Sequence, residues 1–323
     1  MIKVEHMSKT YGTYPAVLDV SFEVLKGEIV GFLGPNGAGK TTTMRIITGY
    51  TPPTEGEVTV GGFDVVRHSL DARRHLGYLP ETVPLYLDMT VTDYLTYMGR
   101  LRGMSRRWVN ERLPDVIDKV RLGEYRNTLV GKLSKGYRQR TGIAQAILHE
   151  PDVLILDEPT IGIDPIQVVE TRQLISELGA AHTLLISSHI LPEVSAICQR
   201  VLVIHEGRIV ADDQPAALSA KLQASERIEL GVKGAQTRDV VNALRDISVV
   251  VDARTDPRVE VQQRAQQEGR LALLVDARPN SGATQTIAKT VIDKGWALTN
   301  LTPLPMTLEE IFLQLTTEED LGD

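Results

Sequence analysis

The chain has 323 residues, 42 % of them hydrophobic, and a formal net charge of −7. This length favours two domains, and because no part of the chain is strongly basic, the sequence argues against a nucleic-acid partner. The longest uninterrupted apolar run, residues 271–275, is far shorter than the roughly 20 residues that span a membrane. With no signal-peptide core at its start and a single cysteine, Cys198, the chain is expected in a reducing compartment, cytoplasmic unless a partner carries it to a membrane.

Short strand signals surround the first motif of the chain. Residues 1 to about 30 alternate apolar segments with turns, and Glu57–Gly62 adds another, which predicts a small antiparallel sheet. Glu28–Leu33 is an apolar run of strand character, and Thr42–Thr48 opens a helix. Between them, residues 34–42 read GPNGAGKTT and fit the phosphate-binding pattern G-x-x-x-x-G-K-[ST] in the strand-to-helix context that it requires.

This glycine-rich loop predicts a nucleotide site. The glycines let successive N–H groups and the N-terminus of the following helix point at one anion. Lys40 adds a positive charge toward the β and γ phosphates, and the hydroxyl of Thr41 is placed to ligate Mg²⁺. The predicted nucleotide-binding residues of the loop are Asn36, Gly37, Ala38, Gly39, Lys40, Thr41 and Thr42.

The middle of the chain changes from helical to strand patterns. Apolar residues spaced by three and four between Val91 and Glu150 predict a helical subdomain at about residues 88–150. Strand signals return at 153–157, 183–188 and 200–207, separated by helical stretches. That alternation predicts an α/β fold with a mostly parallel core sheet. Ligands of such sheets bind at the carboxyl ends of the strands.

Polar residues follow two of these strands. Asp157 and Glu158 end the first one, and a buried strand has no packing reason to finish on two carboxylates. Asp157 suits Mg²⁺, directly or through water, and Glu158 suits polarising a water for attack on a γ phosphate. His189 follows the second strand on the same edge, within reach of that phosphate. Taken alone, the carboxylates are a turn signal and the histidine is a surface or core residue; the phosphate loop favours the functional interpretation.

Residues 133–140 read LSKGYRQR and come just before a helix. Ser134 and Gly136 are typical of a helix N-terminus with free N–H groups, which attracts anions. The same residues also describe an ordinary capped helix with an arginine-rich first turn.

Taken together, LSKGYRQR, the strand ending in DEPT and the segment GIDP at 162–165 resemble the nucleotide-binding subunit of ATP-binding cassette (ABC) transporters over residues 1 to about 215. The resemblance implies a P-loop NTPase fold of the ABC ATPase type, with a mostly parallel core sheet, an antiparallel β subdomain and a helical subdomain. It also implies hydrolysis of ATP with Mg²⁺. The implied partners are an integral-membrane permease and a second copy of the chain, or a paralogue, across the ATP sites.

The family's site residues can be carried over by position. Tyr11 matches the aromatic residue that stacks on adenine, and Asp164 matches the loop that crosses the dimer interface. Ser134 and Gly136 match the signature residues that clasp the γ phosphate of a nucleotide held by a second subunit. The catalytic carboxylate and the switch histidine correspond to Glu158 and His189.

The chain departs from the family pattern at three positions. Lys135 and Tyr137 occupy the third and fifth positions of the usual LSGGQ signature, and Glu81 replaces the glutamine that senses the γ phosphate. A glutamate can accept from water or ligate Mg²⁺ but cannot donate as an amide does, and it adds negative charge. The segment GYLPE around Glu81 and the segment MTLEEIFLQLT at 306–316 look most like exporters of the multidrug and gliding-motility type.

A change of composition marks a domain boundary. The sequence turns polar and alanine-rich between Ala211 and Glu226, which predicts an ATPase domain at 1–218 and a C-terminal accessory domain at 219–323. The strand and helix patterns of the second domain predict a ferredoxin-like α+β fold that ends in a helix at 307–315. No cluster of polar or metal-ligand residues stands out there, so dimer stabilisation is the simplest hypothesis for its role.

The leading interpretation is an ATPase subunit that drives export from the cytoplasmic face of the membrane through a separate permease. Residues 81–97 leave apolar and aromatic side chains for that permease, or belong to the core of the helical subdomain. One alternative is a soluble ABC ATPase acting on ribosomes or DNA, which the single cassette and the absence of heptads and of a basic face disfavour. Another is a regulatory module that binds nucleotide without hydrolysis, which the presence of Glu158 and His189 disfavours.

Overall fold

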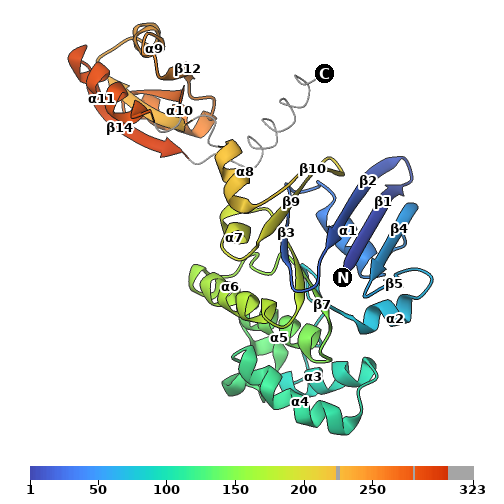
Figure 1. The fold of residues 1–323 in the computed structure, drawn as a ribbon. Coiled ribbons are helices and arrows are strands. Elements are labelled where there is room, and N and C mark those ends of the chain that lie inside the picture. Colours follow the sequence, from blue (N-terminus) through green and yellow to red (C-terminus); the bar gives the residue numbers. More distant parts are fainter. Residues whose placement is uncertain (223–225, 279–280, 305–323) are drawn as a thin grey trace. The chain divides into compact units, whose positions relative to one another are not determined.

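The computed structural model describes residues 1–222, 226–278 and 281–304. The chain divides into two compact units, Met1–Pro215 and Ala216–Asp323 (Figure 1). The division falls at the start of helix α8 (Pro215–Leu222), close to the boundary at 218 and 219 that the sequence predicts.

The first unit contains the predicted antiparallel sheet. Its strands, in the order β2-β1-β4-β5, are β2 (Tyr14–Val24), β1 (Ile2–Tyr11), β4 (Glu55–Val60) and β5 (Phe63–Asp64). Every neighbouring pair runs antiparallel. Alternate residues of β1 such as Ile2 and Val4 are buried, as expected for a sheet with one face on a core.

The second sheet of this unit is the predicted α/β core. Its strands, in the order β10-β9-β3-β8-β7-β6, are β10 (Arg208–Asp213), β9 (Arg200–His205), β3 (Ile29–Leu33), β8 (Thr183–Ser188), β7 (Val153–Asp157) and β6 (Leu76–Leu79). Only β10 runs antiparallel to its neighbour. Every residue of β3, β7 and β8 is buried, which is why these strands are continuous apolar runs. The sequence pattern does not predict β6 and β10.

Helices cover both faces of the core sheet. Helix α1 (Lys40–Ile47) contacts β2 and β4 of the antiparallel sheet and β7 of the core sheet, so it lies between the two sheets. Helices α6 (Pro165–Gly179) and α7 (Leu191–Ser195) lie on the other side of the core sheet (Figure 1). A short helix, α2 (Ser69–Arg74), packs near β4, β5 and β6.

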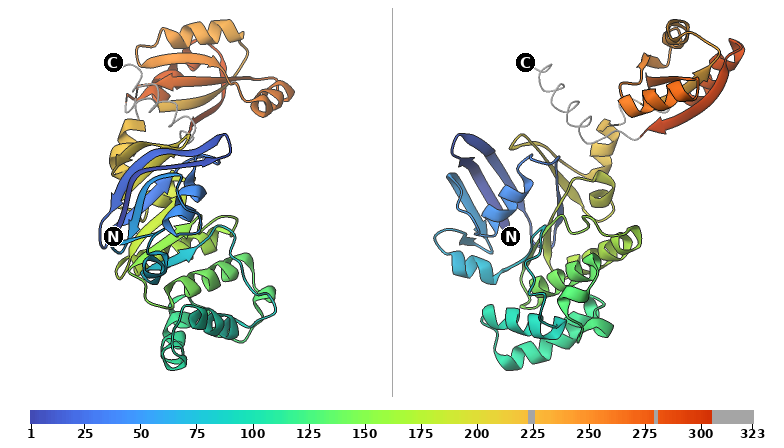
Figure 2. Two further views of the ribbon diagram at one scale, coloured as in Figure 1. Left: turned by 90° about the vertical axis from the view of Figure 1, so that its right-hand side faces the viewer. Right: turned by 180° about the vertical axis from the view of Figure 1, so that it is seen from behind.

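The predicted helical subdomain is inserted between β6 and β7. Its elements are α3 (Val91–Leu101), α4 (Arg106–Lys119), two short 3₁₀ helices (Gly123–Tyr125 and Val130–Lys132) and α5 (Lys135–Ile147). Side chains of Thr90, Ser105 and Ser134 cap the three α-helices at their N-termini. The helices stay together in both views of Figure 2.

The second unit is built on one antiparallel sheet. Its strands, in the order β12-β13-β11-β14, are β12 (Val250–Thr255), β13 (Leu271–Ala277), β11 (Glu226–Lys233) and β14 (Ala297–Leu304). The helices between them are α9 (Thr237–Arg245), α10 (Val259–Gln267) and α11 (Ala283–Asp293). Alternate residues of β11, Ile228 and Leu230 among them, pack with residues of α9 and α11 in a separate apolar core.

From β11 onward, the described part of this unit follows the predicted order of strands and helices with one addition. Helix α10, between β12 and β13, was not predicted, because the polar stretch VEVQQRAQQ has few apolar residues to mark a helical face. The helix predicted at 307–315 lies outside the described residues.

Candidate functional site

The phosphate loop connects the carboxyl end of β3 to α1. Gly37 and Gly39 have φ of +83° and +109°, a region that favours glycine, and a Cβ on Gly39 would come 2.6 Å from the carbonyl oxygen of Ala16. Glycine is therefore required at Gly39 for both its φ angle and its space. The loop curls so that Lys40 begins α1 almost fully buried, with 6 % of its surface exposed.

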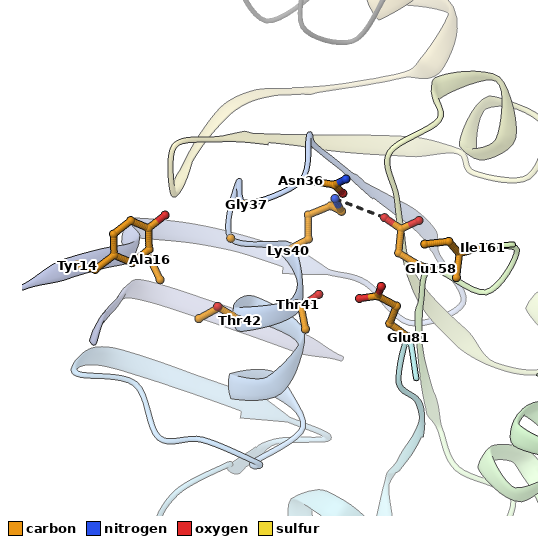
Figure 3. Close-up of a pocket in the computed structure, with 11 residues that line it drawn as sticks. Tyr14, Ala16, Asn36, Gly37, Lys40, Thr41, Thr42, Glu81, Glu158 and Ile161 are labelled. Atoms are coloured by element: carbon orange, nitrogen blue, oxygen red, sulfur yellow. Dashed lines mark ion pairs between the residues drawn. The ribbon is translucent and has the colours of Figure 1, made fainter. Parts of the chain in front are cut away.

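The ammonium group of Lys40 has two backbone partners and one carboxylate nearby. Its Nζ donates to the carbonyl oxygens of Gly34 at 2.7 Å and Pro35 at 3.1 Å, and it lies 3.4 Å from Oε1 of Glu158 (Figure 3). An ammonium group has three protons. The two carbonyls account for two of them, so the third is the one that a carboxylate or a phosphate can take.

A pocket of about 280 Å³ surrounds this loop. The predicted site residues that line it are Asn36, Gly37, Gly39, Lys40, Thr41, Thr42, Glu81 and Glu158. Tyr14, Ala16 and Ile161 also line it and were not predicted. Ala38 is a buried residue of the loop and does not line the pocket.

Tyr14 lines the pocket, and Tyr11, to which the resemblance gave the adenine contact, does not. The two tyrosines face each other across the turn between β1 and β2. Tyr14 lines the pocket on the opposite side of the loop from Glu158 (Figure 3), whereas Tyr11 is not a lining residue, and the ammonium group of Lys9 lies 5.2 Å from its ring centroid. The fold of the hairpin decides which aromatic side chain reaches the pocket, and spacing along the sequence cannot show this.

Asp157 is the last residue of β7 and is completely buried. Its Oδ1 accepts a hydrogen bond of 2.5 Å from the hydroxyl of Ser187 on β8, while its Oδ2 is buried without a partner. Burial raises the pKa of this carboxyl; the hydrogen bond from Ser187 opposes the rise, and the charges of Glu158 and Glu81 add to it. The ionised carboxylate has negative charges nearby and no cationic partner among the causes of its pKa shift, so a bound cation would stabilise it.

Glu158 has an unusual backbone conformation. Its φ of +49° lies in the left-handed region, which costs a non-glycine residue roughly 1–3 kcal/mol. Its N–H donates to the hydroxyl of Ser187 at 2.9 Å, which fixes this conformation. The carboxylate is turned inward, with its Oε1 near Lys40 and its Oε2 2.8 Å from Nδ1 of His189. The strain is held at the residue whose side chain faces the phosphate loop.

His189 and Glu158 come from neighbouring strand ends of the core sheet, as the sequence predicts. When Glu158 is ionised, Nδ1 of His189 must carry the proton of their hydrogen bond, which makes Nε2 the free acceptor in the neutral ring. Ser187, which holds both Asp157 and Glu158, was not predicted. The polar pair Ser187-Ser188 at the end of an otherwise apolar strand was a usable signal for it.

Glu81 follows the short strand β6, which the sequence analysis missed. The glutamate is exposed, and it lines both the loop pocket and a second cavity of about 450 Å³. Thr41 and Asp157 also line that second cavity. Glu81 is therefore close enough for its negative charge to act on Asp157 at the end of β7.

Ser134, Gly136 and Asp164 form a separate group, and none of them lines the loop pocket. Ser134 and Asp164 cap α5 and α6, and the Asp164 carboxylate accepts from the N–H of Gln167 at 3.0 Å. The end of the Gln167 side chain lies directly over Gly136, in the space that a Cβ would take. The side chain of Lys135 lies against Gly162, next to this group.

Comparison with known proteins identifies the family. A family model described as ABC transporter matches residues 17–161. Over 198 residues the chain is 42 % identical to the ABC transporter ATP-binding protein NatA of Bacillus subtilis (strain 168), covering 60 % of this chain and 80 % of that protein. The chain belongs to the ABC transporter family. The chain is thus the ATP-binding, ATP-hydrolysing subunit of a transporter, with the matched residues in the first unit.

Two further similarities extend this result. The chain is 33 % identical over 323 residues to the Nod factor export ATP-binding protein I of Paraburkholderia xenovorans (strain LB400), which covers 98 % of this chain and 97 % of that protein. A solved ATP-binding subunit of an ABC transporter covers 69 % of this chain and 93 % of its own, with a TM-score of 0.62 and 30 % identity. The first similarity includes the C-terminal unit as well as the cassette.

Replacing Glu158 by Gln removes the negative charge that can polarise a water and keeps the shape of the side chain. We expect ATP hydrolysis to slow by on the order of 10² to 10⁴ and ATP affinity to stay within a few fold, because only the water-activating step is lost. Phosphate release and equilibrium ATP binding measure the two effects. Loss of ATP binding would instead show that Glu158 is a structural residue.

Replacing Tyr14 by Ala tests which tyrosine contacts the adenine. Stacking of a base on an aromatic ring contributes roughly 1–3 kcal/mol, so we expect the Kd for ATP to rise by on the order of tenfold or more. Tyr11→Ala is the matched control and should leave the Kd nearly unchanged. If a titration with ATP shows a raised Kd for Tyr11→Ala and not for Tyr14→Ala, the adenine contact belongs to Tyr11.

Proposed function

We propose that two copies of this chain, or this chain and a paralogue, close around two ATP molecules and drive export through a separate membrane permease. The observation that carries the proposal is the division of the site residues. Lys40 and Glu158 line one pocket, and His189 hydrogen-bonds to Glu158 from outside the lining, whereas Ser134 and Gly136 neither line the pocket nor pair with these residues in the contacts described. A site completed by a second subunit uses both groups, and a site within one chain uses only the first.

Mg²⁺ fits the end of β7. The cation usually binds through one or two carboxylates together with phosphates and waters. Asp157 has a buried, unpartnered oxygen, and Thr41 and Glu81 line the same cavity. Among the described residues there is no cluster of three or more His, Cys, Asp or Glu side chains that could hold a metal alone, which agrees with a cation completed by a nucleotide. When bound, Mg²⁺ would neutralise charge on the β and γ phosphates.

The side chains of the pocket divide the work of hydrolysis. Lys40 holds the β and γ phosphates, and Glu158 orients a water and takes its proton. As the water oxygen bonds to the γ phosphorus, the bond from that phosphorus to the bridging oxygen breaks, which yields ADP and phosphate. His189 keeps the Glu158 carboxylate in place through their 2.8 Å hydrogen bond.

The second subunit would contribute Ser134, Gly136 and Asp164. The N-terminus of α5, which Ser134 caps through the N–H of Tyr137, is a favourable environment for a phosphate. Lys135 and Arg138 add positive charge beside it. The same positive charge offsets the negative charge that Glu81 brings to the opposite half of the site.

The surface next to Glu81 suits a membrane partner. Tyr94, which the sequence left open between core and surface, is 1 % exposed and belongs to the core of the helical subdomain. Tyr86 and Tyr97 are 48 % and 38 % exposed, with ring centroids 5.5 Å apart. Apolar surface that remains exposed beside the nucleotide pocket marks a contact site, so these two rings are the proposed surface for the permease.

The permease must supply the membrane passage. None of the helices described in residues 1–222, 226–278 and 281–304 has the length and apolar character that crossing a bilayer requires. The relative from Paraburkholderia xenovorans is an export protein by its description, and this supports export over import. We therefore place the chain at the cytoplasmic face of the membrane, held there by the permease. The multidrug and gliding-motility subtype remains a prediction from the resemblance.

The C-terminal unit is proposed to be a ferredoxin-like domain that stabilises the dimer. The order β12-β13-β11-β14 with α9 and α11 packed on one face supports the fold assignment. The relative that covers both units is again an ATP-binding subunit of an exporter, so a role within the transporter is favoured over an unrelated activity.

A recruitment assay tests the transport proposal. The chain is produced with a multi-span membrane protein taken as the candidate permease from the neighbouring reading frames, and its recovery with the membrane fraction is measured. Tyr97→Asp should lower recovery at least several fold, because it places a charge on the proposed contact surface. Trp108→Asp is the matched control, since Trp108 is equally exposed, at 38 %, on α4. Equal recovery of both variants, or none with unaltered chain, would contradict the proposal.

Removal of residues after 222 tests the C-terminal role. The cassette has its own apolar core, so it should remain folded. In the Glu158→Gln background with ATP, we expect the truncated chain to dimerise at least tenfold more weakly, the loss of about 1.4 kcal/mol or more of association free energy. Sedimentation gives the dimer Kd, and unchanged association would assign the domain another role.

A further inference from the structure

One glutamate outside the pocket connects three segments of the cassette. Glu193 lies in α7, and its side chain is 13 % exposed. Its Oε2 accepts from the Thr160 hydroxyl at 2.7 Å and lies 3.5 Å from the Ser188 hydroxyl, and its Oε1 accepts from Nη2 of Arg172 at 3.1 Å. The partners belong to the turn after β7, the end of β8 and the middle of α6.

These partners flank Glu158 and His189, which are hydrogen-bonded to each other beside the pocket. Thr160 comes two residues after Glu158, and Ser188 directly precedes His189. The Ser188 hydroxyl also accepts from the N–H of Ile190 at 3.0 Å, so it closes the backbone around His189. Both ends of the hydrogen bond between Glu158 and His189 are therefore attached, within two residues, to the carboxylate of Glu193.

The contacts require a carboxylate at this position. All the groups that face it donate hydrogen bonds, and a carboxylate is the side-chain group that only accepts. Arg172 supplies the opposite charge, which an ionised group needs when it is mostly removed from water. A glutamine would direct its NH₂ group at a donor, at either Arg172 or the Thr160 and Ser188 side.

We infer that Glu193 is a positioning residue for the Glu158–His189 pair. It joins the turn at 159–164 to the turn that carries His189, so that the two side chains stay at hydrogen-bonding distance. The inference rests on the proposed roles of Glu158 and His189 in hydrolysis. Glu193 itself does not line the loop pocket, so its effect must pass through those two residues.

Glu193→Gln in the full-length chain tests this directly. Because small displacements of a reacting group can cost up to about 10² in rate, we expect kcat for ATP hydrolysis to fall by roughly 10- to 100-fold. The KM and the equilibrium Kd for ATP should change by less than about threefold, since the residue does not touch the nucleotide pocket. An unchanged kcat would overturn the inference.

A matched pair at Thr160 keeps the test valid if Glu193→Gln folds poorly. Thr160→Ser retains the hydroxyl that donates to Glu193, and Thr160→Val retains the shape without it. We expect nearly normal kcat for the serine variant and a loss of severalfold or more for the valine variant, with the same melting temperature for both. Equal activity of the two variants would overturn the inference.

A double-mutant cycle separates positioning from a general structural role. In the His189→Ala background, Glu193→Gln should lower kcat by less than about twofold, because the pair it positions no longer exists. A purely structural role would lower kcat by the same factor in both backgrounds and would contradict positioning. If His189→Ala and Glu158→Gln hydrolyse ATP normally, the proposed function fails; if they are impaired and Glu193→Gln is not, only this inference fails.

Discussion

The parallel register of three central strands is the constraint on which the site depends. Leu33 at the end of β3 pairs with Ser188, and Asp157 at the end of β7 pairs with Ser187. This register brings the phosphate loop, the two carboxylates and His189 to one edge of the sheet. A slip of one residue would turn the side chains of a strand to its opposite face, and the contacts of Lys40 and Glu158 would be lost.

Buried charge at that edge is compensated unevenly. Lys40 and Glu158 are almost fully buried and partner each other, with carbonyl oxygens and His189 as further partners. Asp157 is completely buried, which raises its pKa, and the charges of Glu158 and Glu81 add to the rise. The folded chain thus keeps an incompletely compensated buried charge at Asp157, where we place Mg²⁺. A locally destabilising residue of this kind is expected where the residue type is required for function and not for stability.

Contacts outside the pocket connect segments of the cassette that are distant in sequence. Ser187 joins β8 to the backbone of Glu158, and Glu193 joins α7 to the turns on both sides. Gln167 fills the space above Gly136, which places the start of α6 against the start of α5. Hydrogen bonds from Arg172 of α6 to Glu193, and from Glu193 to Thr160 and Ser188, therefore connect the helix that begins at the surface that we assign to the second subunit to the turns next to Glu158 and His189.

The sequence by itself determined the phosphate loop, the buried strands β3, β7 and β8 and the polar residues at their ends, because glycine spacing and continuous apolar runs are local properties. It did not show β6, β10 or α10, which are short or polar and form through pairing and packing with distant residues. Only the tertiary structure decided that Tyr14 reaches the pocket, that Glu158 takes a left-handed conformation and that Glu193 bridges two turns. These features depend on contacts between strands and turns that are distant in sequence, and a local sequence pattern does not specify such contacts.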